Sequence, residues 1–153
     1  MDINNAIRQG ELLEVMEYIE ANPKLVDQRD SKGFTPLIMS TYCEQLDIAK
    51  YLLEQGADIN AQDGAGNTAL MGVCFKGHKD IALHLINNGA MLDVVNYNNA
   101  TALIYAATFG QTEIVELLLS KGADKSIKDK RGNTAYDHAQ FQGVPAMMNL
   151  LAD

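Results

Sequence analysis

Residues 63–95 read "DGAGNTALMGVCFKGHKDIALHLINNGAMLDVV", and this stretch aligns without gaps with residues 30–62 and 96–128. The three copies are equal in length, and a partial copy runs from residue 129 to the end. One threonine place recurs in all four copies and one glycine place in the three full ones: Thr35, Thr68, Thr101 and Thr134, and Gly56, Gly89 and Gly122. Self-similarity at a fixed period of about 20 to 50 residues is typical of folds built from stacked repeats.

Within each copy, the residue types predict two short helices. The threonine hydroxyl can accept a free amide of the first helical turn, and Pro36 suits the position after such a cap. Apolar residues then follow at helical spacing, such as Leu70, Val73 and Cys74. A second helix ends at the recurring glycine, where a left-handed residue is often needed. The core of the second helices is expected to contain Leu53, Leu85 and Leu118.

A polar turn separates successive helix pairs. Its fourth residue is Gly33, Gly66 or Gly132, and Asn99 takes this place in the third copy. Asparagine is the non-glycine residue that best tolerates positive φ, so this position is expected to be left-handed throughout. Asn22, followed by a proline, is expected to end an earlier helix in the same way.

The period, the threonine caps, the glycines and the "GAD" element together resemble the ankyrin repeat. The resemblance covers about residues 30 to 153 and, more loosely, 1–29; the segment "NPKLVDQRDSKGFTPL" is also similar to small bacterial ankyrin proteins. It implies an all-α solenoid of stacked helix-turn-helix units with projecting β-hairpin-like turns. The expected single domain has these parts: a capping repeat 1–29, full repeats 30–62, 63–95 and 96–128, and a capping repeat 129–153.

This sequence departs from the repeat's T-P-L-H-x-A signature. The signature histidine is replaced by Ile38, Met71, Ile104 and Asp137, and only one copy keeps the proline. We therefore expect weaker hydrogen bonding between neighbouring units, with the same fold.

The stretch from Gly64 to Ala69 also fits the spacing G-x-G-x-x-A of dinucleotide-binding loops. Such a loop follows a hydrophobic strand, whereas the residues before it here read "ADINAQ". The same turn recurs as "DSKGFTP", "NYNNATA" and "DKRGNTA". The pattern is therefore interpreted as a turn between repeats, and no cofactor is expected.

The resemblance implies binding of a partner protein by the turn tips and by the concave face of the first helices. The second, third, fifth, thirteenth and fourteenth places of each copy are expected to be exposed, and all four phenylalanines fall there. Exposed aromatic residues are common anchors of protein interfaces. The alternative is that these rings pack on the turn of the adjacent unit. The predicted binding residues are Lys32, Phe34, Tyr42, Asn67, Phe75, Lys76, Tyr97, Phe109, Lys130, Arg131 and Phe141.

Composition narrows the class of function. A formal charge of -8 disfavours nucleic acid as a partner, because affinity for phosphates depends on Lys and Arg. The first residues have neither the basic start nor the apolar run of a secretory signal, so none is expected, and no apolar run is long enough to span a membrane. Two cysteines are too few for a disulfide framework. Cys43 is expected to be exposed. A cytoplasmic monomer is predicted, with Glu11, Glu14, Glu17 and Glu20 forming either a solvated capping face on the first helix or an acidic docking site.

None of the three histidines belongs to a metal-binding or catalytic motif: His78, His84 and His138. The predicted function is therefore a non-enzymatic protein-binding module that acts as an inhibitor, an immunity protein or an accessory factor. The alternatives are a small-molecule or enzymatic function in the groove and self-association through the aromatic face.

Overall fold

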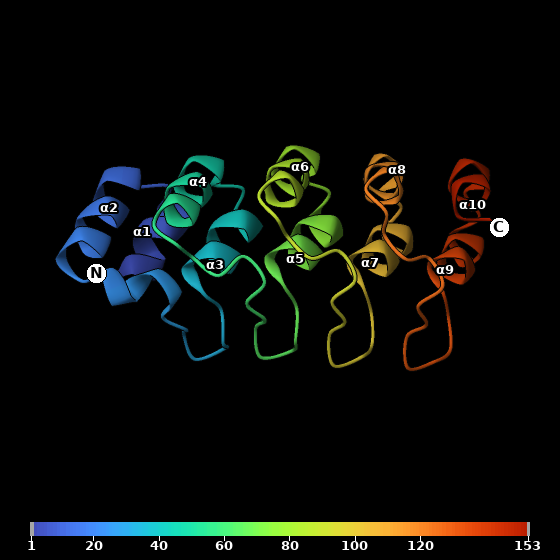
Figure 1. Ribbon diagram of the computed structural model, residues 1–153, viewed down its shortest axis with the longest axis horizontal. Helices are drawn as coiled ribbons and strands as arrows, with labels where there is room; N and C mark the ends of the chain where they lie inside the picture. The colour runs from blue at the N-terminus through green and yellow to red at the C-terminus, as the bar shows by residue number, and fades with distance from the viewer. Residues whose placement is uncertain (1, 153) are drawn as a thin grey trace. The chain divides into compact units, whose positions relative to one another are not determined.

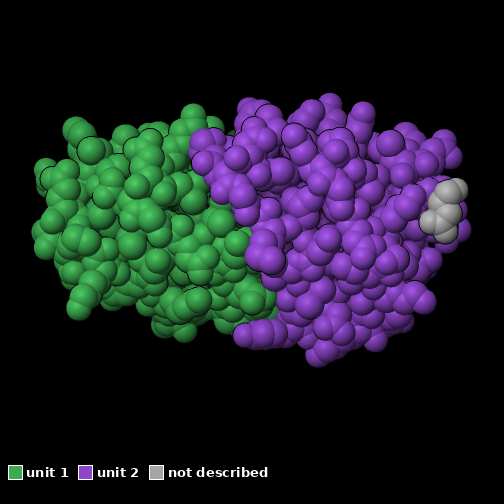
Figure 2. Space-filling view, viewed as in Figure 1, with its two compact units in different colours: residues 1–69 green, residues 70–153 purple. Residues whose placement is uncertain are grey.

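The computed structural model describes residues 2–152. The chain divides into two compact units, Met1–Ala69 (unit 1) and Leu70–Asp153 (unit 2), which are coloured separately in Figure 2. Within the described residues, every regular element is helical: α1 (Ile3–Gln9), α2 (Leu12–Ala21), the 3-10 helix η1 (Pro23–Asp27), α3 (Pro36–Tyr42), α4 (Leu46–Glu54), α5 (Ala69–Lys76), α6 (Lys79–Asn87), α7 (Ala102–Thr108), α8 (Thr112–Ser120), α9 (Ala135–Gln142) and α10 (Pro145–Leu151). The expected all-α fold of stacked helix-turn-helix units is confirmed. The predicted single domain and its repeat boundaries stay predictions.

Each unit has two helix layers (Figure 1). In unit 1, α1 packs beside α3 and α2 beside α4; in unit 2, α7 packs beside α9, and α8 lies between α6 and α10. The first and second helix of a pair also contact each other, as α3 does with α4 and α7 with α8. The core of each unit lies where these helices meet.

The second helices bury one leucine at each equivalent place. Leu85 and Leu118 are 1% and 0% exposed, as expected, but the prediction for Leu53 is wrong. Leu53 is half-buried, whereas Leu52 is 0% exposed. The register explains this: a step of one full period back from Leu85 reaches Leu52, which shares a helix face with Ile48.

The predicted threonine caps are present in α3, α7 and α9. The hydroxyl oxygens of Thr35, Thr101 and Thr134 accept the N–H of the residue three positions on, at 3.2, 3.2 and 3.3 Å. In α9 the Asp137 carboxylate also accepts the Thr134 N–H at 2.9 Å, which completes a capping box. Each of these first helices therefore begins at the residue after its threonine.

The turn before each of these threonines is a short loop that we call a finger. Fingers 1 to 4 are residues 30–34, 63–67, 96–100 and 129–133. In each finger the Oδ1 of the first residue accepts the backbone N–H groups two and four residues further on, at 2.9 or 3.0 Å. The fourth residue has positive φ, between 57° and 85°, and this includes Asn99 as predicted. An Asp or Asn at the first place therefore fixes the path of the loop.

The expectation that the fifth place of each copy is exposed is wrong. Ala100 is buried, and Phe34, Asn67 and Asn133 are half-buried. The backbone N–H and C=O of the fifth residue both bond to the first residue of the finger. The fifth residue therefore lies at the base of the finger and not at its tip.

The two glycines of the dinucleotide-like stretch have separate structural reasons. Gly66 has a φ of 85°, which favours glycine. Gly64 donates its N–H to the Lys32 carbonyl at 3.1 Å, and a Cβ at Gly64 would lie 2.8 Å from that same oxygen. Residues 57–62, which precede the stretch, form no strand. The stretch is therefore a contact between fingers 1 and 2.

An arginine side chain also joins finger 1 to the residue before finger 2 within unit 1. The Arg29 guanidinium donates to the Gly33 carbonyl at 2.9 Å and to the Gln62 carbonyl. In unit 2 the counterpart of the Gly64–Lys32 bond joins fingers 3 and 4: the Lys130 N–H donates to the Asn98 carbonyl at 3.0 Å. Neighbouring fingers within a unit are thus joined by a backbone hydrogen bond, to which the Arg29 side chain adds a second link in unit 1.

Two expectations for the N-terminal residues need correction. Asn22 has a φ of -148°, so it does not end α2 in a left-handed conformation; its side chain accepts the Lys24 N–H and caps η1. The four glutamates belong to the second helix of the first pair: α2 contains Glu14, Glu17 and Glu20, and Glu11 stands at its N-cap position without a side-chain capping bond. They do not lie on the preceding helix α1, which ends at Gly10 with φ of 74°.

Replacing Gly64 with alanine should destabilise the protein by about 1–3 kcal/mol, because the added methyl would overlap the Lys32 carbonyl. Urea unfolding followed by circular dichroism measures this. Ser31→Ala, at an exposed place on finger 1, is the matched control and should change the free energy of unfolding little. Equal unfolding midpoints for wild type and Gly64→Ala would show that the fingers do not pack as described.

Truncating Leu118 to alanine should lower the free energy of unfolding by about 2–5 kcal/mol, since its side chain is fully buried. Leu119→Ala, on the same helix but half-buried, should cost less. Thermal and urea melts of both variants test this. A larger loss at Leu119 than at Leu118 would contradict the helix register.

Candidate partner-binding face

Five of the predicted binding residues are large aromatic side chains exposed to solvent. Their exposed fractions range from 40% for Phe75 to 70% for Phe141. Four of them lie at or just beyond the C-terminal ends of first helices, and Tyr97 lies in finger 3: Tyr42, Phe75, Phe109, Phe141 and Tyr97. The predicted cations Lys32, Lys76, Lys130 and Arg131 are also exposed, whereas Phe34 and Asn67 are half-buried at finger bases.

Three aromatic rings of unit 2 form a continuous set, which we call the aromatic row. The Phe75 ring stacks on Phe109 with centroids 4.5 Å apart and planes inclined by 14°, and the Tyr105 centroid lies 6.3 Å from that of Phe109. Phe75 and Phe109 nevertheless remain 40% and 47% exposed. The packing of a ring on the neighbouring repeat therefore does not exclude a role at the surface.

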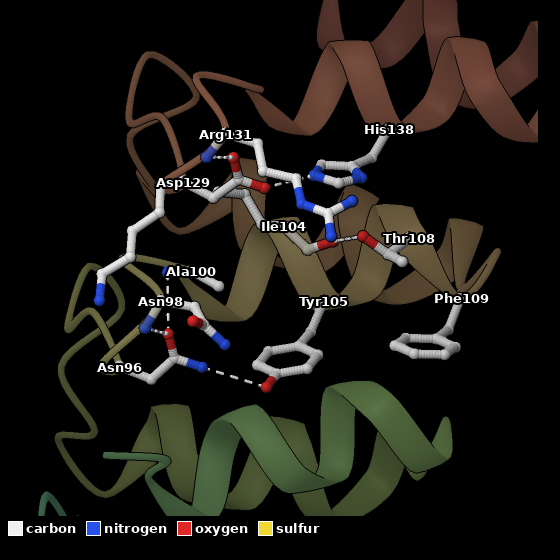
Figure 3. Close-up of a pocket in the computed structure, with 11 residues that line it drawn as sticks. Asn96, Asn98, Ala100, Ile104, Tyr105, Thr108, Phe109, Asp129, Arg131 and His138 are labelled. Atoms are coloured by element: carbon white, nitrogen blue, oxygen red, sulfur yellow. Dashed lines mark hydrogen bonds and ion pairs between the residues drawn. The ribbon is translucent and has the colours of Figure 1, made fainter. Parts of the chain in front are cut away.

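A pocket of about 380 Å³ lies beside this row, wholly within unit 2 (Figure 3). Fingers 3 and 4 and helices α7 and α9 contribute its lining. It combines aromatic faces, side-chain amides, one carboxylate and two cations. The lining residues are Asn96, Asn98, Ala100, Ile104, Tyr105, Thr108, Phe109, Asp129, Lys130, Arg131 and His138.

The carboxylate of the pocket is already fully engaged. Asp129 Oδ1 accepts the N–H groups of Arg131 and Asn133, and its Oδ2 lies 2.7 Å from His138 Nε2. Burial opposes ionisation of Asp129, but the hydrogen bonds from His138, Asn133 and Arg131 and the charge on His138 together outweigh it and lower the pKa of this carboxyl. An ionised carboxylate can only accept, so Nε2 of His138 carries the proton that joins them.

An equivalent link joins finger 3 to α7. Asn96 uses Oδ1 for the backbone of its own finger and places its Nδ2 3.1 Å from the Tyr105 hydroxyl oxygen. Tyr105 and His138 stand one full period apart, as do Asn96 and Asp129. Each finger of unit 2 is thus tied to the helix that follows it by a polar side chain at the same place of the repeat.

The cations at the mouth of the pocket behave differently. Lys130 and Arg131 are exposed, and their side chains form no hydrogen bond or ion pair within residues 2–152. Figure 3 shows the Arg131 side chain reaching from finger 4 across the pocket toward Thr108. By contrast, Lys79 lies 3.6 Å from the Glu113 carboxylate. The pocket therefore offers positive charge that the described chain does not neutralise.

The sequence-based interpretation missed Asn96, Tyr105, Asp129 and His138 as parts of the site. The signal was available in the period, because the two pairs occupy matching places in successive copies. The period did not show that the Tyr105 and His138 side chains reach the finger and bond to it. Met39 and Gly72 occupy the same place in the earlier copies and have no polar side chain to make such a bond.

The hydroxyl, carboxylate and imidazole groups of the pocket are hydrogen-bonded within the protein. The Thr108 hydroxyl donates to the Ile104 carbonyl at 2.7 Å, and Asp129 holds His138. Cys74 is buried, which raises the pKa of its thiol. Cys43, expected to be exposed, is half-buried with its Sγ 3.9 Å from Met39 Sδ.

In residues 2–152, no three His, Cys, Asp or Glu side chains are grouped to hold a metal ion. No helix in these residues is long and apolar enough to cross a membrane.

The comparison with known families agrees with this architecture. The family described as ankyrin repeats in three copies matches residues 3–63 and 61–129. The chain belongs to the ankyrin-repeat family. The match extends over residues 3–29, where the sequence signature is weakest, and no curated protein matches the chain. Ankyrin repeats are generic protein-interaction modules and typically non-enzymatic scaffolds, so protein binding is the general function that this membership supports.

The Asp129–His138 pair predicts a pH dependence of stability. Because the folded-state pKa of Asp129 is lowered, its contribution is fully present above the unfolded pKa of about 3.9 and is lost as the pH falls through the folded value. Asp129→Asn should keep both backbone bonds, as Asn96 does, but lose the charged acceptor for His138. This variant should be less stable at neutral pH and should lose less stability on acidification to about pH 2.

Urea unfolding at a series of pH values measures both effects. Asp80→Asn, at an exposed position on α6, is the control and should follow the acid profile of wild type. Parallel acid profiles for wild type and Asp129→Asn would contradict the assigned role of the pair.

Proposed function

We propose that this ankyrin-repeat protein binds a partner protein through its first-helix face and finger tips, using the exposed aromatic residues as anchors. The observation that carries the proposal is the aromatic row, in which Phe75 and Phe109 stack on each other and still expose 40% and 47% of their surface. Rings that are held rigid and left half exposed can bury area in a complex with little loss of side-chain entropy.

The distribution of exposed apolar side chains supports this choice of face. Among residues 2–152, the large exposed hydrophobic residues include the five predicted aromatic anchors, and four of these lie on or next to the first helices or fingers of unit 2: Phe75, Tyr97, Phe109 and Phe141. Others, such as Leu13 on α2 and Leu83 on α6, stand on second helices as single residues. Scattered apolar residues are normal, whereas grouped aromatic ones mark interaction sites.

The proposed mode of action is occupation of a partner's surface, as an inhibitor, an immunity protein or an accessory factor would do. Membership of a family of typically non-enzymatic scaffolds supports a role without catalysis. We further propose that the protein acts as a cytoplasmic monomer. The alternative, a small-molecule or enzymatic function, would use the pocket of about 380 Å³, whose volume lies in the range of ligand sites.

Affinity capture from the native cell tests the proposal. Wild type and the double variant Phe75→Ala/Phe109→Ala are tagged and compared, and the double variant should bind the captured partner about thirtyfold or more weakly, as loss of a hot spot does. Leu83→Ala is the control, because Leu83 is 38% exposed on α6, in the other helix layer.

Two outcomes would contradict the proposal. One is an unchanged affinity of the double variant for a partner that wild type captures. The other is stabilisation of wild type in a thermal-shift screen of metabolites with no captured protein, which would favour the small-molecule alternative. Light scattering of the purified protein distinguishes a monomer from self-association through the aromatic row.

A further inference from the structure

We propose that the pocket of unit 2 recognises an acidic segment of the partner protein, an extended peptide that carries a carboxylate side chain two residues from an aromatic one. In this arrangement Arg131 and Lys130 bind the carboxylate, and the aromatic side chain packs on the aromatic row. The inference rests on the proposed protein-binding function and adds the chemistry of the ligand.

The cations provide the first reason. Arg131 and Lys130 line the pocket, and neither side chain has a hydrogen-bond or ion-pair partner within residues 2–152. The one carboxylate in the pocket, Asp129, uses both oxygens for His138 and for two backbone N–H groups. Arg29 differs from Arg131, since its guanidinium has a structural role and donates to two backbone carbonyls.

A carboxylate is therefore the group that the pocket is missing. The planar guanidinium of arginine binds a carboxylate through two parallel hydrogen bonds, and such charge-assisted pairs are the strongest in proteins. Figure 3 shows the Arg131 side chain directed over the pocket and not away from it. A carboxylate held there would lie beside the aromatic row.

The charge of the whole chain limits the size of the anion. The formal net charge is -8, but residues 121–131 hold five of the twelve basic residues and only two aspartates. A long polyanion such as a nucleic acid meets repulsion from the rest of the surface and needs many cations to neutralise its phosphates. One or two carboxylates on a peptide match the two cations at the pocket.

The backbone N–H groups at the tip of finger 4 are already bonded within the protein, which limits how a peptide can bind there. The Arg131 N–H bonds to Asp129, and the Lys130 N–H bonds to the Asn98 carbonyl. These donors are not free to pair with an added strand, so recognition depends on side chains. In an extended peptide, side chains two residues apart point to the same side at a spacing of about 7 Å, which lets one reach the cations and the other reach the row.

The test uses the full-length protein labelled with ¹⁵N and a capped pentapeptide, acetyl-Ser-Glu-Ser-Phe-Ser-amide, whose only charge is the glutamate. Titration by NMR should shift the amide resonances of the pocket, including those of Asn98, Phe109 and Arg131. The peptide with glutamine in place of glutamate should bind about tenfold more weakly, because it loses the charge-assisted bonds. The peptide with alanine in place of phenylalanine should also bind more weakly.

Protein variants provide the matched comparison. Arg131→Gln and Lys130→Gln should each bind the acidic peptide several-fold to about tenfold more weakly and should bind the glutamine peptide as wild type does. Lys50→Gln, at an exposed position on α4, is the control and should bind as wild type. Because neither pocket cation has a side-chain partner in the described fold, both variants should keep the wild-type melting temperature.

Several results would overturn the inference. These are equal affinity for the glutamate and glutamine peptides, unchanged affinity of Arg131→Gln, or no shift of pocket resonances at saturating peptide. Tighter binding of inorganic phosphate or of a thymidine oligonucleotide would identify the anion as a phosphate and reject the acidic peptide.

The same variants separate this inference from the proposed function. If the captured partner is lost with Phe75→Ala/Phe109→Ala but retained with Arg131→Gln, the binding face is right and the acidic ligand is wrong. If the partner is retained by all variants, the proposed function itself fails.

Discussion

The fold depends on one hydrogen-bonding device, an Asp or Asn side chain whose Oδ1 accepts two backbone N–H groups at the base of each finger. These two bonds hold the following residues in a tight loop and require positive φ at the fourth place, where Gly33, Gly66, Asn99 and Gly132 stand. The sixth residue is then placed to cap the next helix, as Thr35, Thr101 and Thr134 do. Because the finger and the cap of the next helix occupy adjacent residues, the same short sequence pattern produces both in each copy.

The same device sets the chemistry of the candidate site. One side-chain atom of the first finger residue is not used by the finger, and in unit 2 that atom contacts a long polar side chain on the next helix: Asn96 Nδ2 meets Tyr105, and Asp129 Oδ2 meets His138. The carboxylate of the pocket is occupied in this way, whereas the cations of finger 4 are not. The pocket therefore has two cationic side chains without a partner among residues 2–152, and it lies beside the aromatic row. Such a surface suits an acidic side chain better than a cation.

Much of the repeat follows from residue types, and the failures have physical reasons. The caps, the left-handed Asn99 and the exposure of Tyr42, Phe75, Tyr97, Phe109 and Phe141 agree with the structure, since each depends on local chemistry or on the place within the repeat. An apolar run predicts Leu53 in the core, and the helix register instead buries Leu52. The repeat pattern predicts Ala100 at an exposed place, and the hydrogen bonds of its backbone hold it at the finger base. Asn22 ends α2 in an extended conformation because the proline after it begins η1.

The sequence by itself determined the period, the helix pairs, the fingers and the family, because these are set by interactions between residues at most a few positions apart. Only the tertiary structure decided that Phe75 stacks on Phe109, which stands one position beyond the equivalent place in the next copy, and that Gly64 lies against a carbonyl of the neighbouring finger. It also decided that the Asp129 carboxylate is hydrogen-bonded to His138, whereas the Arg131 guanidinium has no partner among residues 2–152. Periodicity identifies equivalent places, but which side chains meet depends on their length and on how closely adjacent repeats approach.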